Sequence, residues 1–236
     1  MTRVALVTGG SRGIGWATAQ CLQSAGHRVA VTYRSSPPPH SDILAVPCDV
    51  NDAEQVDTAF DQIERELGQV EVLVSNAGIT ADMLVLRMSD DDFMRVIDTN
   101  LAGALRVARR ALPRMMRARW GRIIFVGSVV GTVGQAGQAN YAASKAGLVG
   151  LARSLAREYA SRNVTVNVVA PGPIESEMLD AVTAERRDLI AQAVPLGRMG
   201  EPREVAATVA FLAGEDAGFV TGAVVPVDGG LGMGPW

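Results

Sequence analysis

The stretch Val4-Ala-Leu-Val-Thr-Gly-Gly-Ser-Arg-Gly-Ile-Gly15 lies near the start of the 236-residue chain. Its first four residues form an apolar run typical of a buried strand, and Thr8-Gly9-Gly10-Ser11-Arg12-Gly13-Ile14-Gly15 then opens a helical pattern. A glycine-rich turn lets backbone N–H groups approach a pyrophosphate, and the N-terminus of the next helix favours its negative charge. The order strand, glycine turn, helix therefore predicts a dinucleotide-binding fold, and an ordinary glycine turn is the alternative interpretation.

Strand-like and helical patterns alternate from one end of the chain to the other. The strand-like runs are rich in Val and Ile and continuously apolar, as strands covered on both faces are. They are residues 3–8, 28–33, 43–48, 70–75, 122–128, 164–170 and 222–227. The alternation predicts an α/β fold, a Rossmann-type doubly wound parallel sheet of about seven strands, as a single domain over residues 1–236.

Local signals predict where individual helices begin and end. Asn51 is expected to cap a helix that has Glu54 in its first turn and stops at Gly68. Ser89 is expected to cap another, because the acidic run Asp90-Asp91-Asp92 suits a helix N-terminus. Three prolines between residues 34 and 42 exclude a helix interior, so this crossover is predicted to have no proper helix.

Composition excludes several classes of protein. A net charge of −3 and a pI near 5.5 argue against binding to nucleic acid. Cys21 and Cys48 are too few and too isolated for a disulfide framework or a metal site. His27 and His40, the only histidines, are both expected at the surface, so no metal site and no histidine-based triad is predicted.

The chain shows no sign of membrane insertion. The N-terminus lacks the pattern of a signal peptide, and no apolar run approaches the about 20 residues that a membrane span needs. We therefore expect a soluble, cytoplasmic protein.

Lys145 is the only lysine in the chain and follows Tyr141 by four residues, so the two side chains share one helix face. An ammonium about 4 Å from a phenol, at an effective dielectric near 20, favours the phenolate by roughly 4 kcal/mol, or about three pKa units. This predicts a tyrosine that titrates near neutral pH and exchanges a proton with a substrate oxygen. The alternative is a chance pair on a solvated helix.

The residue after the second strand indicates which dinucleotide binds. Folds specific for NAD place an acidic residue there, whereas this chain has Tyr33-Arg34. With Arg12 in the glycine turn, two guanidinium groups could hold a 2′-phosphate, which favours NADPH. The alternative is that these arginines are solvated surface charges. Asp49-Val50 is predicted to meet the adenine, and Asn76-Ala77-Gly78 follows the fourth strand where the dinucleotide should pass.

The chain carries several short motifs, which are Thr8-Gly9-xxx-Gly13-Ile14-Gly15, Asn76-Ala77-Gly78, Asn100, Gly127-Ser128, Tyr141-xxx-Lys145, Pro171-Gly172-Pro173-Ile174 and Val227-Asp228-Gly229-Gly230. With these motifs, nearly the whole chain resembles the short-chain dehydrogenases/reductases, and within that family the bacterial β-ketoacyl-[acyl-carrier-protein] reductases. Ser75 and the short proline loop are similar to the mycobacterial type, which acts in type II fatty-acid elongation.

The resemblance implies a role for each site residue. Tyr141 would be the general acid in NADPH-dependent reduction, and Lys145 would lower its pKa and bind the nicotinamide ribose. Ser128 would hold the substrate carbonyl oxygen. Asn100 would anchor a water that relays protons to Lys145, and Ile174 would offer backbone groups to the nicotinamide carboxamide.

Arginines are the candidate contacts to an acidic carrier protein. The resemblance implies that Arg119 and Arg162 dock acyl carrier protein near the active-site mouth. Arg106, Arg110, Arg114 and Arg117 also follow a helical stripe, which would suit a carrier protein, a solvated face, or salt bridges across a subunit interface. The family expectation is a homotetramer built on the helices carrying Asn100 and Tyr141 and on the C-terminal strand.

Residues 175–200 are expected to form a substrate lid. Apolar Met178, Leu179, Ile190 and Leu196 lie there among charged residues, and such helices can close over an acyl chain. Packing of this region against the sheet is the alternative interpretation.

The main functional hypothesis is reduction of 3-oxoacyl thioesters on acyl carrier protein. Two alternatives stay open at this level. One is a related reductase of acetoacetyl-CoA, a polyketide ketone or another carbonyl, and the other is a regulatory subunit that binds NADPH without turnover.

Overall fold

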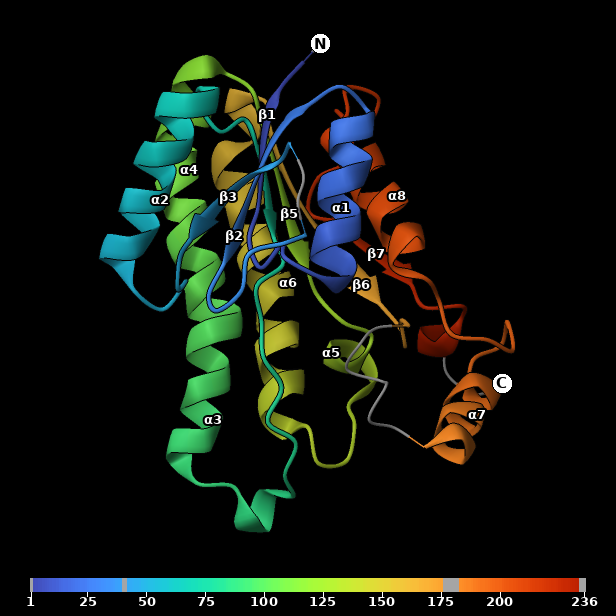
Figure 1. Cartoon of the computed structure of the whole chain (residues 1–236). Helices are drawn as coiled ribbons and strands as arrows, with labels where there is room; N and C mark the ends of the chain where they lie inside the picture. Colours follow the sequence, from blue (N-terminus) through green and yellow to red (C-terminus); the bar gives the residue numbers. More distant parts are fainter. Residues whose placement is uncertain (1, 40–41, 176–182, 234–236) are drawn as a thin grey trace.

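The computed structural model describes residues 2–39, 42–175 and 183–233 (Figure 1). Seven strands form one sheet in the order β3-β2-β1-β4-β5-β6-β7, and every neighbouring pair is parallel. The chain starts in the middle of the sheet, builds one half outward and then returns to build the other, which confirms the predicted doubly wound topology. The strands are β1 Val4–Val7, β2 Arg28–Tyr33, β3 Leu44–Pro47, β4 Val72–Ser75, β5 Gly121–Val126, β6 Val164–Pro171 and β7 Val224–Val227.

Helices cover both faces of the sheet (Figure 1). On one face lie α1 (Gly13–Ser24) and α8 (Pro202–Ala213), and on the other lie α2 (Ala53–Leu67), α4 (Gly103–Ala118) and α6 (Ala139–Tyr159). In the part of the chain that the structure describes, no helix is long and apolar enough to cross a membrane. The shorter helices are η1 Val85–Arg87, α3 Asp90–Ile97, η2 Asp98–Ala102, α5 Val130–Val133, η3 Ala160–Arg162, α7 Ala184–Ala193 and η5 Leu231–Met233.

The sheet has an apolar core on each face, which explains why apolar and polar residues do not alternate along the strands. Ile123 of β5 packs with Phe60 and Leu112 from the helices of one face. Its neighbour Ile124 points the other way and packs with Leu22 from the opposite helices. Because successive side chains of a strand face opposite sides, a sheet covered on both faces needs apolar residues at every position.

The predicted helix boundaries are confirmed in three places and wrong in one. Ser89 forms a capping box with Asp92, and α2 ends before Gly68. The described residues between Tyr33 and Leu44 contain no helix, as the prolines predicted. However, Asp52 rather than Asn51 caps α2, because its carboxylate accepts from two backbone N–H groups while the Asn51 amide is engaged elsewhere.

The element η2 is a π-helical turn that joins α3 to α4. It contains Asn100, which the sequence had suggested lay within an ordinary helix. Single π-helical turns inside α-helices redirect side chains and often occur at functional sites. Here the turn presents Asn100 to α6, and the residue is almost fully buried.

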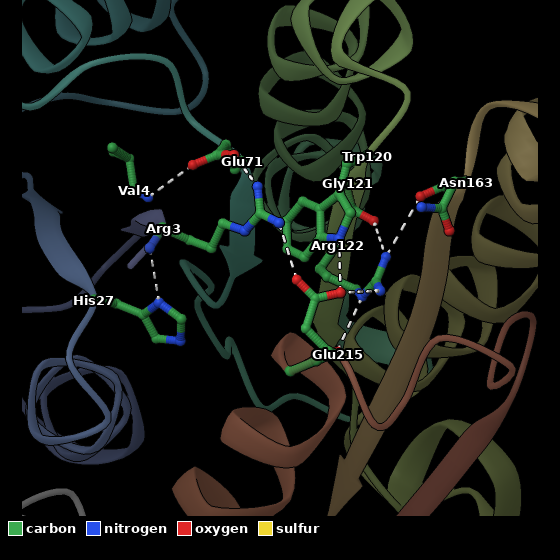
Figure 2. A network of polar contacts seen from close by, with 10 residues as sticks. Arg3, Val4, His27, Glu71, Trp120, Gly121, Arg122, Asn163 and Glu215 are labelled. Carbon is green, nitrogen blue, oxygen red and sulfur yellow. Dashed lines mark hydrogen bonds and ion pairs between the residues drawn. The ribbon is translucent and has the colours of Figure 1, made fainter. Parts of the chain in front are cut away.

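A network of charged and aromatic side chains closes the amino-terminal edge of the sheet (Figure 2). The guanidinium carbons of Arg3 and Arg122 lie 4.0 and 4.4 Å from the Trp120 ring centroid. Glu215 accepts from Arg3 over 2.9 Å and from the Trp120 indole over 3.1 Å. His27 also takes part, since its Nδ1 accepts from the Arg3 backbone N–H. His27 is therefore partly buried at the surface, where burial lowers its pKa, and the predicted surface residue His40 lies outside the described residues.

Candidate active site

A cleft of about 470 Å³ opens at the carboxyl ends of the central strands, where open α/β sheets bind ligands. Most predicted site residues line it, although they come from segments far apart in the sequence. Gly10 packs on Val31 beneath the glycine turn, and Asn100 lies behind the cleft wall. The predicted residues that line the cleft are Gly9, Ser11, Arg12, Gly13, Ile14, Gly15, Arg34, Asp49, Val50, Asn76, Ala77, Gly78, Ser128, Tyr141, Lys145 and Ile174.

The glycine turn is held against the end of β4 by polar side chains. The Asn76 amide donates to the carbonyls of Thr8 and Gly9 over 3.0 Å each. In return, the Thr8 hydroxyl accepts from the backbone N–H groups of Asn76 and Ala77. A Cβ on Gly15 would lie 2.5 Å from the Asn76 amide nitrogen, so only glycine allows this close approach. The turn therefore presents backbone N–H groups and a helix N-terminus to the cleft, which suits a pyrophosphate.

Arginines and hydroxyls gather at one end of this cleft. Arg12 and Arg34 are both exposed and line it from the glycine turn and from the end of β2. Ser35 and Ser36 line it as well, next to Arg34, and were not singled out from the sequence. Guanidinium groups beside hydroxyl donors form a suitable site for an anion such as phosphate.

The segment after β3 is fixed to the π-helical turn and α4. The Asn51 amide donates to the Thr99 hydroxyl over 3.0 Å. From α4, Arg106 donates to the Val50 carbonyl over 3.4 Å and binds the Asp98 carboxylate over 2.7 Å. A Cβ on Gly103 would lie 2.8 Å from the Val50 side chain, so this helix packs closely on the segment. The predicted adenine contacts are thus positioned by the element that carries Asn100.

Tyr141 and Ser128 meet in the cleft. Both side chains line it, and the Ser128 oxygen accepts from the Val130 backbone N–H over 3.2 Å. Burial raises the pKa of Tyr141 above its ordinary value, although the neighbouring Ser128 hydroxyl opposes that effect. The prediction that the phenol titrates near neutral pH is therefore wrong for the chain on its own, because the loss of hydration outweighs the opposing effect of Ser128 on the Tyr141 pKa.

Lys145 lines the cleft, although its side chain is almost fully buried. Its ammonium lies 5.5 Å from the Tyr141 ring centroid and donates to the Val126 carbonyl over 2.8 Å. Burial lowers the pKa of Lys145 to about 8. A Cβ on Gly78 would come within 3.5 Å of this ammonium, so glycine keeps the space above it open. The lysine can therefore gain or lose a proton close to neutral pH.

The Asn100 side chain is used in hydrogen bonds within the protein. Its oxygen accepts from the Ile79 backbone N–H over 2.8 Å, and its nitrogen donates to the Ile79 carbonyl over 3.0 Å. The same nitrogen donates to the Ser144 hydroxyl over 3.0 Å. An amide group has only two N–H donors, so both are taken. Asn100 thus joins the chain after β4 to helix α6.

Two arginines of the stripe do not belong to an open cationic face. Arg106 pairs with Asp98, and Arg110 pairs with Asp57, Asp61 and Glu64. The partners of Arg110 all lie on α2, the neighbouring helix of the same chain. Acidic residues distant in sequence therefore neutralise these two arginines, and contact of the stripe with a carrier protein or another subunit stays a prediction.

Arg119 and Arg162 are exposed neighbours, and Arg119 donates to the carbonyl of Ser161. They precede β5 and β6, whereas Ser128 follows β5 at its carboxyl end. A strand of six residues spans about 20 Å. The expectation that both lie near the active-site mouth is therefore wrong within one chain. Both arginines lie at the amino ends of the strands, whereas the cleft opens at the carboxyl ends.

The predicted lid falls partly outside the described residues, which include neither Met178 nor Leu179. In its described part, α7 buries none of its side chains and stands clear of the sheet in Figure 1. Of the predicted apolar lid residues, Leu196 is 68% exposed and Ile190 is partly buried. Packing against the sheet, the alternative interpretation, does not apply to α7.

The chain is similar to proteins described as reductases of acyl-carrier-protein substrates. A family model described as enoyl-(acyl carrier protein) reductase matches residues 9–232. The chain is 53% identical to the 3-oxoacyl-[acyl-carrier-protein] reductase MabA of Mycobacterium tuberculosis, over 99% of this chain and 94% of the relative. It is 51% identical to MabA of Mycobacterium avium, covering 99% and 91%. It is also 46% identical to the 3-oxoacyl-[acyl-carrier-protein] reductase FabG of Escherichia coli, covering 98% of each.

Proposed function

Because the chain belongs to the short-chain dehydrogenase/reductase family, we propose that it reduces 3-oxoacyl-[acyl-carrier-protein] to 3-hydroxyacyl-[acyl-carrier-protein] with NADPH, in cytoplasmic fatty-acid biosynthesis. One observation carries the proposal beyond the likeness to the reductases MabA and FabG. It is that the hydroxyls of Ser128 and Tyr141 line one cleft together with Lys145, whose side chain is almost fully buried.

The described residues fit a bound NADPH. Gly13 has a φ of +54° in a turn whose N–H groups face the cleft, which suits the pyrophosphate. Arg12 and Arg34, with the hydroxyls of Ser35 and Ser36, suit a 2′-phosphate. When bound, NADPH would supply the hydride that reduces the ketone.

The protein's own part in the reaction is to hold the substrate oxygen and to provide a proton. Ser128 and Tyr141 would both donate to the carbonyl oxygen, on which negative charge grows as the ketone is reduced. Because its raised pKa keeps Tyr141 protonated at neutral pH, the hydroxyl is ready to give its proton to the much more basic alkoxide. Lys145, with a pKa of about 8, can then return a proton toward the phenolate.

The first test is a substrate comparison. Oxidation of NADPH and of NADH would be followed with the same 3-oxoacyl group on acyl carrier protein and on coenzyme A, and with an enoyl thioester. We expect turnover that prefers NADPH, the 3-oxo group and the carrier protein. Turnover of the enoyl thioester alone would favour the reaction in the family model's description. NADPH binding without turnover of any thioester would overturn the proposal.

We further propose a homotetramer in which carrier protein docks on Arg119 and Arg162. The tetramer is supported by β7, an edge strand whose four residues all retain exposed surface that another subunit could cover. Both arginines lie at the amino ends of the strands, and the cleft lies at the carboxyl ends. A carrier protein docked on them would therefore serve the active site of a neighbouring subunit. Changing both to Glu should raise KM for the carrier-protein thioester but not for the coenzyme A thioester.

The matched control for that double variant is Arg203→Glu, because Arg203 is an exposed arginine on α8. An equal rise in KM for both thioesters would remove the two arginines from docking. The oligomeric state itself is measured by light scattering, and a monomer that is fully active on carrier protein would overturn the tetramer.

A further inference from the structure

Ser144 is a fully buried hydroxyl beside the reacting groups, and it has no part in the chemistry above. It lies on α6 between Tyr141 and Lys145, on the side that faces the π-helical turn. Its hydroxyl donates to the Tyr141 carbonyl over 2.7 Å, and the hydroxyl oxygen accepts from the Asn100 amide over 3.0 Å. The hydroxyl therefore connects Asn100 to the backbone of the residue that provides the proton.

The other contacts of Asn100 extend this connection to the cleft wall. Both backbone groups of Ile79 bind the Asn100 amide. Ile79 itself lines the cleft, directly after Gly78. Because the amide has no N–H group to spare, the Ser144 oxygen is the acceptor that satisfies its last donor. Removing that oxygen would leave a buried N–H unpaired, so the amide would turn or shift.

The backbone of Tyr141 is held at both of its polar groups by buried side chains. Its N–H donates to the Asn140 side-chain oxygen over 2.8 Å, and its carbonyl accepts from Ser144. Asn140 is also fully buried, and its amide nitrogen donates to the Ala81 carbonyl over 3.0 Å. The first turn of α6 is thus tied twice to the segment after β4, which forms one wall of the cleft.

We propose that Ser144 is a positioning residue for Tyr141. By joining Asn100 to the Tyr141 carbonyl, it sets how α6 sits against the wall formed by Ile79, and so where the phenol lies relative to Ser128. This inference rests on the proposed function, in which Tyr141 gives the proton. Such a role matters because a misplacement of about 1 Å can cost 100-fold in rate.

The test compares two serine-to-alanine changes on the same helix. Ser144→Ala removes one buried oxygen, and Ser154→Ala removes an exposed one ten residues later. For each variant, kcat, the Kd for NADPH by fluorescence titration, and unfolding by urea would be measured. We expect Ser144→Ala to lower kcat at least about tenfold, while its Kd for NADPH stays within about twofold of the wild-type value. Ser154→Ala should match the wild type.

A second variant separates positioning from a general loss of packing. If Ser144 acts through Asn100, then Asn100→Ala combined with Ser144→Ala should be no slower than Asn100→Ala alone. The inference would be overturned if the two changes lowered kcat independently, so that the loss in the double variant equalled the product of the two single losses. A wild-type kcat for Ser144→Ala would also overturn it. These outcomes differ from failure of the proposed function, in which the wild-type protein itself would not reduce a 3-oxoacyl thioester.

Discussion

The Lys145 ammonium donates a hydrogen bond to the backbone carbonyl of Val126 over 2.8 Å. Val126 is the last residue of β5, two positions before Ser128. This contact therefore fixes the helix that carries Tyr141 to the strand end that carries Ser128. The two hydroxyls are brought together by a lysine that is itself almost wholly removed from water.

The buried lysine should make stability depend on pH in a defined window. Burial lowers the pKa of Lys145 from its ordinary 10.5 to about 8. Between these values the unfolded chain binds more protons at this group, so the free energy of unfolding should rise with pH. The shift corresponds to about 3 kcal/mol.

Urea unfolding between pH 7 and pH 11 of the wild type and of Lys145→Met would check this, since the variant lacks the titrating group. The difference between the two curves isolates Lys145. Parallel curves would mean that the ammonium titrates normally in the folded protein.

Removing the Tyr141 hydroxyl should abolish turnover while leaving cofactor binding. Tyr141→Phe keeps the ring but has no proton to give, so kcat should fall by about 100-fold to 10,000-fold. The Kd for NADPH, measured by fluorescence, should change by less than about fivefold, because one neutral hydrogen bond contributes about 1 kcal/mol. Near-normal turnover would remove Tyr141 from its assigned role.

Arg34 should discriminate between the two nicotinamide dinucleotides. In Arg34→Asp a carboxylate replaces a guanidinium at the end of β2, where it would repel a 2′-phosphate and accept from a ribose hydroxyl. We expect the Kd for NADPH to rise roughly 100-fold, about 3 kcal/mol, with little change for NADH. Titration of the variant with both dinucleotides measures this, and equal losses would place the phosphate elsewhere.

Arg106 should support cofactor binding from outside the cleft. It holds the Val50 carbonyl and the Asp98 carboxylate, so Arg106→Leu should loosen the segment after β3. We expect the Kd for NADPH to rise about fivefold, or about 1 kcal/mol, with kcat nearly unchanged.

The control for this prediction is Arg110→Leu, one helical turn away, which loses ion pairs to α2 and no contact near the cleft. Calorimetric titration of both variants with NADPH makes the comparison. Equal losses of affinity would show that helix stability, rather than the contact to Val50, is what matters.

Several features could be predicted from short stretches of the chain. The glycine turn after β1, the capping box at Ser89 and the absence of a helix after Tyr33 all follow from backbone geometry and nearby side chains. The spacing of Tyr141 and Lys145 placed both residues in the cleft, because four residues make about one helical turn. These predictions held since they depend on neighbours within a few residues.

Other predictions failed where a partner distant in sequence decides the outcome. Asp52 caps α2, whereas the Asn51 side chain donates to Thr99, which lies far away in the sequence. The acidic residues that neutralise Arg110 lie on α2, and no local pattern in α4 indicates them. Nothing in the residues around Ser144 indicated its bond to Asn100.

The amino-acid pattern was enough to predict the doubly wound sheet, the glycine turn and the candidate site residues that line the cleft, because periodicity and spacing act along the chain. Folding in three dimensions decided how two of these residues differ from the free side chains, since burial among segments far apart in sequence raises the pKa of Tyr141 and lowers that of Lys145. Desolvation depends on everything that surrounds a group, so it can be evaluated only once the sheet and its helices have closed around the two side chains.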